Sequence, residues 1–166
     1  MTGPWRRSRE WVDARFTEGG WYPGRDIGEA ALARLAGPMT AAYREDGRYG
    51  MELFPAAAAF LREHAEVALR LGARPSDRLV FSPHLVHRSA AAAAAELARG
   101  LGRRVFTIGY DADEGAVFYI DEDGRFFYEF WEELHFVGGD KYEAFGGPVF
   151  GGPDAEDFYT AAPAPR

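Results

Sequence analysis

The sequence predicts an α+β domain in which N-terminal helices pack on a C-terminal antiparallel sheet. Up to about residue 101 the apolar residues recur at the 3.6-residue spacing of helices, and from Val105 the period falls to two, as in strands. Of the 166 residues, 47% are hydrophobic and 15% aromatic, which is enough for one packed core. We expect residues 1–152 to form this single domain and residues 153–166, which end in Ala-Ala-Pro-Ala-Pro-Arg, to be a flexible tail.

The first part of the chain predicts two helices. Residues 5–16 place apolar side chains on one helical face, and Gly19-Gly20 ends this helix. The second helix should begin at Asp26, because aspartate caps helices well and Glu29 completes a capping-box pattern. Gly37-Pro38 should interrupt it, since proline lacks the backbone N–H that a helix interior requires.

Two more helices follow, with a brief strand between them. The third helix should begin at Pro55, because proline lacks a backbone N–H and the N–H at the first helical position has no partner within the helix. Its apolar stripe continues to Leu71, and Leu79-Val80-Phe81 is expected to be a strand. The alanine-rich helix over residues 90–101 begins after Ser89, and its small side chains let it lie close to a sheet.

The sheet is expected from residue 105 onward. Alternating apolar residues predict four strands, over residues 105–110, 116–120, 125–131 and 134–137. Asp121-Glu122-Asp123-Gly124 is a strong hairpin signal, because glycine tolerates a positive φ. A short helix should start at Asp140.

The chain contains no pattern typical of an enzyme or a metal site. It has no cysteine, no phosphate-binding glycine loop and no catalytic serine motif. His84 and His87 are three residues apart, but a zinc site needs further ligands that the sequence does not identify. The two Asp-rich turns lack the glutamate of a calcium loop, so we interpret them as turns. We therefore predict no catalytic residues, no metal and no cofactor.

Charge is distributed unevenly along the chain. Residues 1–109 carry 16 basic and 12 acidic residues, whereas residues 110–166 carry 3 basic and 14 acidic residues. An acidic region of this kind steers a basic protein partner, and it disfavours direct nucleic-acid binding because phosphates need cationic groups. The alternative is that these carboxylates only keep an aromatic-rich sheet soluble.

The strand over residues 125–131 predicts a partner-binding surface. One face carries Phe126, Tyr128 and Phe130 and can line the core, while the other mixes Phe127 and Trp131 with charged residues. Aromatic anchors among charges suit a protein interface, although helices covering both faces of the sheet are the alternative. From charge and strand phase we predict these contact residues: Asp121, Asp123, Phe127, Glu129, Trp131, Glu132 and Glu133.

Four segments of the chain form an ordered series of motifs. They are Gly20-Trp21-Tyr22-Pro23-Gly24-Arg25, Phe54-Pro55-Ala56-Ala57 with Phe60-Leu61-Arg62-Glu63, Gly102-Arg103-Arg104-Val105-Phe106-Thr107-Ile108-Gly109, and Ile120-Asp121-Glu122-Asp123-Gly124-Arg125. In this order and spacing they resemble the third subfamily of the SUKH superfamily of immunity proteins. The chain departs from that pattern where His64-Ala65-Glu66 stands in place of a helix-ending Gly-Gly-Leu run, and where Thr107 replaces a proline.

The resemblance implies a single SUKH-like α+β domain that binds a toxin, often a nuclease, and blocks it. We therefore predict a cytoplasmic immunity protein that neutralises a cognate basic toxin by protein–protein contact. No membrane association is expected, since the N-terminus lacks the apolar segment of a signal peptide. Two alternatives remain: a general adaptor for a cellular protein, and a small-molecule-binding protein or enzyme with a pocket near Trp21, His84 and His87. The oligomeric state is not predicted.

Overall fold

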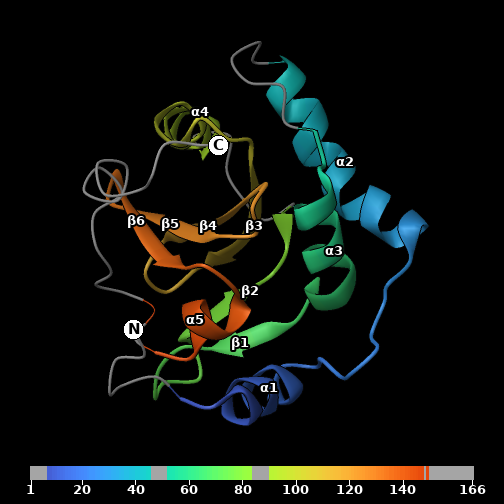
Figure 1. Cartoon of the computed structure of the whole chain (residues 1–166), viewed down its shortest axis with the longest axis vertical. Coiled ribbons are helices and arrows are strands. Elements are labelled where there is room, and N and C mark those ends of the chain that lie inside the picture. Colours follow the sequence, from blue (N-terminus) through green and yellow to red (C-terminus); the bar gives the residue numbers. More distant parts are fainter. Residues whose placement is uncertain (1–6, 46–51, 84–89, 148, 150–166) are drawn as a thin grey trace.

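A six-stranded antiparallel sheet with helices on both faces makes up the protein (Figure 1). The structure is a computed structural model, and it describes residues 7–45, 52–83, 90–147 and 149. Helices dominate the first part of the chain and most of the sheet comes from the second part, which confirms the predicted α+β class. The predicted tail over residues 153–166 and the histidines His84 and His87 lie outside the described residues.

Side-chain caps mark the start of two of the described helices, and a proline marks the start of a third. The described helices are α1 (Arg9–Glu18), α2 (Glu29–Glu45), α3 (Pro55–His64), α4 (Ala90–Leu101) and α5 (Lys141–Phe145). The Ser8 hydroxyl accepts the N–H of Trp11 at 3.2 Å and caps α1, which therefore starts later than predicted. Pro55 occupies the start of α3 as expected, and the Asp140 carboxylate caps α5.

The second helix differs from its prediction in two ways: it does not start at Asp26, and Gly37-Pro38 does not interrupt it. It begins at Glu29 because the Asp26 carboxylate accepts the N–H of Gly28 and bonds to Arg62, so it does not cap the helix. It also continues through Pro38. One face of α2 buries Leu32, Ala36 and Met39 in the core, and this packing outweighs the local preference of proline.

The third helix ends at His64, so the predicted continuation to Leu71 is wrong. Ala65 is extended and Glu66 has a left-handed φ of 66°. The N–H of Glu66 donates to the carbonyl of Phe81 at 2.8 Å, and the N–H of Phe81 donates to the carbonyl of Val67 at 3.1 Å. Strand pairing therefore begins where the apolar spacing still fits a helix, and Glu66 takes the left-handed position that glycine usually fills.

The strands follow one another across the sheet in chain order. They are β1 (Ala68–Arg70), β2 (Arg78–Val80), β3 (Val105–Asp111), β4 (Ala116–Asp121), β5 (Phe126–Phe130) and β6 (Glu133–Gly138). The sequence predicted all of them except β1. The register of β3 on β4 shifts between Thr107 and Gly109, and at Gly109 a Cβ would lie 2.7 Å from the carbonyl oxygen of Val80.

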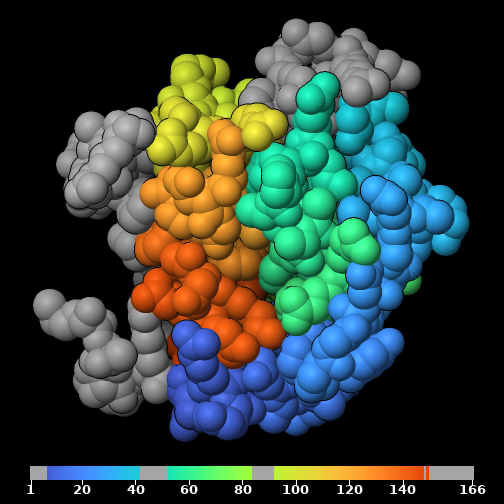
Figure 2. Space-filling model, turned by 45° about the vertical axis from the view of Figure 1, so that its right-hand side comes forward, coloured from blue at the N-terminus to red at the C-terminus, as the bar shows by residue number. Residues whose placement is uncertain are grey.

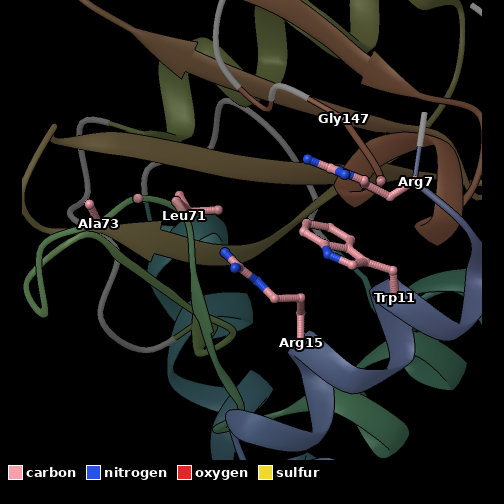
Figure 3. Close-up of a pocket in the computed structure, with 8 residues that line it drawn as sticks. Arg7, Trp11, Arg15, Leu71, Ala73 and Gly147 are labelled. Carbon is pink, nitrogen blue, oxygen red and sulfur yellow. The ribbon is translucent and has the colours of Figure 1, made fainter. Parts of the chain in front are cut away.

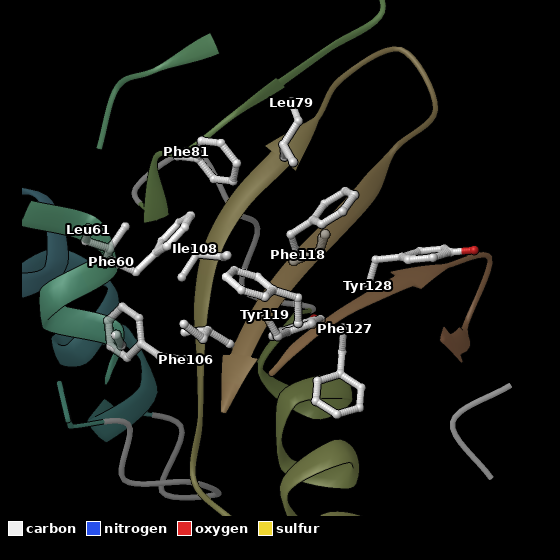
Figure 4. Packing of buried hydrophobic residues seen from close by; sticks show 14 of the residues in the cluster. Phe60, Leu61, Leu79, Phe81, Phe106, Ile108, Phe118, Tyr119, Phe127 and Tyr128 are labelled. Carbon is white, nitrogen blue, oxygen red and sulfur yellow. The ribbon is translucent and has the colours of Figure 1, made fainter. Parts of the chain in front are cut away.

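Aromatic side chains fill the core on both sides of the sheet (Figure 4). On the α3 side, the ring of Phe60 meets those of Phe81 and Phe126 edge to face, each with centroids 5.1 Å apart. On the other side, Phe127 is fully buried and lies toward α4. In the space-filling view, the blue N-terminal segment, green α3 and the orange-red sheet form one continuous surface (Figure 2). Helices thus cover both faces of the sheet, which was the alternative to an exposed sheet face.

Candidate functional site

The turn between β5 and β6 brings four of the seven predicted contact residues together. Phe130 pairs with Glu133, so the hairpin is closed by only two residues, Trp131 and Glu132. Glu129 precedes the turn, and its carboxylate accepts the N–H of Glu132 at 2.9 Å. We call Glu129, Trp131, Glu132 and Glu133 the acidic hairpin.

The acidic hairpin has a strained backbone. Trp131 and Glu132 have φ values of 51° and 65°, as in the two-residue turns that normally use Asn-Gly. Left-handed φ angles cost residues with a Cβ on the order of 1 kcal/mol each, so this turn is not the most stable choice for the fold. Strain of this kind concentrates at functional sites. In effect, the turn carries a large aromatic and a carboxylate where the fold alone would favour Asn-Gly.

Trp131 is the most exposed large hydrophobic side chain among the described residues, at 81%. Its ring forms a T-shaped pair with that of Phe130, with centroids 6.0 Å apart. Glu132 and Glu133 flank it, and the side chain of Glu133 is 71% exposed. Within the described residues no arginine or lysine forms an ion pair with the three glutamates, although His135 lies 3.6 Å from Glu133. The hairpin therefore presents an aromatic group surrounded by uncompensated negative charge.

Two of the predicted contact residues, Asp121 and Phe127, are buried and cannot offer their side chains to a partner in this fold. Phe127 pairs with Tyr119 on the neighbouring strand and lies 5.5 Å from the ring of Phe136. The Asp121 carboxylate accepts the backbone N–H groups of Asp123 and Arg125 and closes the turn between β4 and β5. Burial raises the pKa of Asp121, while the guanidinium of Arg125 opposes that shift. Phe127 does lie on the opposite face of β5 from Phe126, as the sequence predicted, but α4 covers that face.

Asp123 lies at the other end of β5 from the acidic hairpin. Its carboxylate is 3.0 Å from the guanidinium of Arg103, within the chain. Five residues of strand separate the two turns, about 17 Å along β5. Asp123 therefore does not form one surface with Trp131.

Of the three residues named for a small-molecule pocket, only Trp21 lies within the described residues, and its side chain is packed against neighbours. Trp21 is 7% exposed and stacks on His64 with centroids 6.0 Å apart, while its indole N–H donates to Glu63 at 3.0 Å. The ammonium of Lys141 lies 4.2 Å from the Trp21 ring and 3.4 Å from Nε2 of His64. Among the described residues, no group of three or more His, Asp or Glu is placed to hold a metal ion.

The buried cluster around His64 fixes the protonation of its imidazole. Nδ1 lies 3.1 Å from the carbonyl of Phe60 and donates to it, so Nε2 is the acceptor that faces Lys141. Burial and the Lys141 ammonium lower the pKa of His64 to about 3. Lys141, the single lysine of the chain, also forms an ion pair with Asp13 at 3.2 Å. The first motif, α3 and α5 are held together by this cluster, which the sequence did not predict.

A family model for the SUKH-3 immunity protein matches residues 8–149. The chain belongs to the SUKH-3 immunity protein family. The match runs from the cap of α1 to beyond α5 and so covers the acidic hairpin and the His64 cluster. Neither the curated proteins nor the solved structures include a significant match to the chain.

Membership of the SUKH-3 family confirms the resemblance on which the prediction rested. Immunity proteins of this kind have protein toxins as partners and are generally not enzymes. In the part of the chain that the structure describes, no helix is long and apolar enough to cross a membrane.

Proposed function

We propose that this SUKH-3 protein neutralises a cognate toxin by binding it directly, and that the acidic hairpin is the main contact. The observation that carries the proposal is Trp131, which is 81% exposed on a strained turn. Tryptophan is enriched among the residues that dominate protein–protein binding energy. Exposing it costs the free protein hydrophobic free energy, and a partner that covers the ring recovers this.

The charge around Trp131 supports a basic partner. Glu129, Glu132 and Glu133 lie on the same turn as Trp131, and no arginine or lysine of the described residues forms an ion pair with them. Negative potential of this kind raises the association rate with a basic surface, and it does so most strongly at low salt. A nuclease toxin binds phosphates with basic residues, so the acidic hairpin would compete for the surface that holds the nucleic acid.

The experiment is a calorimetric titration of this protein with the C-terminal domain of the secreted toxin encoded beside its gene. Toxin activity is assayed in the same mixtures at low and at high salt. Tight binding that weakens with salt and abolishes toxin activity is the expected result. Full toxin activity and no binding at either salt would contradict the proposal and favour the adaptor alternative.

A second experiment assigns the surface. Reversing the charges with Glu132→Lys and Glu133→Lys should slow association by about tenfold or more at low salt, with a smaller effect on dissociation. The control is Glu18→Lys with Glu29→Lys, which changes the net charge equally on exposed positions of α1 and α2. Equal slowing by both pairs would show that only net charge matters and would remove the hairpin from the interface.

A further inference from the structure

A hollow of about 560 Å³ lies between α1, the loop that follows β1 and the chain that follows α5 (Figure 3). Arg7, Trp11 and Arg15 line one side of it, and small residues of the two loops line the other. The hollow shares no residue with the acidic hairpin. Its volume is in the usual range for small-molecule sites.

The two arginines of the hollow are held in place by the indole of Trp11. The guanidinium carbon of Arg7 lies 5.4 Å from the ring centroid, and that of Arg15 lies 5.0 Å from it. Arg15 also donates to the carbonyl of Arg70, and the backbone N–H of Arg7 donates to the carbonyl of Gly146 at 2.7 Å. Figure 3 shows Trp11 between the two arginine side chains, whose charged ends extend toward the hollow.

The charges of Arg7 and Arg15 are not compensated within the described residues. Some of the other arginines there form ion pairs with carboxylates, such as Arg62 with Asp26 and Arg103 with Asp123. Neither Arg7 nor Arg15 has such a partner in the described part of the chain, and no carboxylate there lines the hollow. Two positive groups thus share one concave site in a protein whose net charge is −7.

We propose that this hollow binds an organic oxyanion, a small molecule whose phosphate or carboxylate groups lie between Arg7 and Arg15. Guanidinium groups bind both kinds of oxyanion through paired, charge-assisted hydrogen bonds. The hollow is larger than a single inorganic ion requires, and Leu71 and the indole edge offer apolar contact to the rest of the ligand.

The test is calorimetry with three probes at constant ionic strength: inorganic pyrophosphate, adenosine monophosphate and citrate. Saturable binding of at least one probe is expected, and the best probe shows whether the site prefers a phosphate ester or a carboxylate. Arg7→Gln and Arg15→Gln should each weaken that binding by about tenfold or more. Arg34→Gln, on the exposed face of α2, should change it by less than about twofold.

The fold of each variant is checked by its thermal melting. Should Arg15→Gln unfold, Arg15→Lys keeps the charge but loses the planar group, and a loss of about tenfold is still expected. The proposal is overturned by the absence of binding for all three probes, or by equal losses in Arg7→Gln and Arg34→Gln. Since no toxin is present in these titrations, either result is independent of the proposed function.

Discussion

Acidification should destabilise the protein through His64. This side chain is 2% exposed, its ring lies among those of Phe16, Trp21 and Phe60, and Lys141 approaches Nε2 to 3.4 Å. The charged groups Asp13, Glu63 and Arg25 are also close. Burial opposes the charged imidazole, and protonation would also place a second positive charge beside Lys141, so the pKa of His64 falls to about 3.

The direction and size of the effect follow from the two pKa values. In the unfolded chain a histidine has a pKa of about 6.5, so below that pH the unfolded state binds a proton that the folded state does not. The stability contributed by neutral His64 is complete above pH 6.5 and is lost as the pH falls toward 3. At pH 5 this loss amounts to about 2 kcal/mol relative to pH 8.

The assay is urea denaturation of the wild type and of His64→Gln at pH 8 and pH 5. The variant cannot be protonated at this site, so the wild type should lose about 2 kcal/mol more than the variant between the two pH values. The difference between the proteins cancels the contributions of other groups, including Asp111 and Asp121, whose pKa values are raised by burial. Equal losses in the two proteins would refute the buried, neutral state of His64.

Three further changes follow from the packing. Lys141→Met should lower the free energy of unfolding by about 2 to 3 kcal/mol, because Asp13 and Nε2 of His64 lose their partner. The control Arg9→Met, which removes a cation from the ring of Tyr142, should cost less than about 1 kcal/mol, and similar losses in the two variants would argue against the cluster. Phe127→Ala should lower it by about 3 to 5 kcal/mol in urea denaturation, and a loss below about 1 kcal/mol would mean that this ring is not core. Replacing Trp131-Glu132 with Asn-Gly should raise the melting temperature and add about 1 kcal/mol, and a loss of stability would contradict the strained turn.

The sequence predicted the meander of β3 to β6 because strand periodicity and the Asp123-Gly124 turn are local signals. Helix boundaries were less predictable, since Pro38 and the residues after His64 are decided by tertiary packing and by pairing with β2. The spacing of Ala68 and Leu71 fits a helix, whereas the strand that forms ends at Arg70 and buries Leu69. The pairing with β2, from Ala68 with Val80 to Arg70 with Arg78, distinguishes the two, and it is not visible in the local apolar pattern.

The grouping of residues at the acidic hairpin was predictable for a similar reason. Charge and strand phase singled out Glu129, Trp131, Glu132 and Glu133, which are neighbours along the chain and stay together at one turn; their contact with a partner stays a prediction. Charge and strand phase could not show that α4 covers Phe127, or that the carboxylate of Asp123 is already bound by Arg103. The arginine hollow escaped prediction because Arg7 and Arg15 are eight residues apart on α1 and its flank and meet the loop after β1 only in the fold.

The affinity of the Trp131→Ala variant for the cognate toxin domain tests the central claim most directly. Removing a hot-spot tryptophan costs at least about 2 kcal/mol, so the dissociation constant should rise about 30-fold or more. Tyr22→Ala is the control, since Tyr22 is an aromatic side chain that is 58% exposed and lies outside the hairpin. A large loss for Trp131→Ala with little change for Tyr22→Ala is the predicted result. Wild-type affinity in the Trp131→Ala variant would contradict the account.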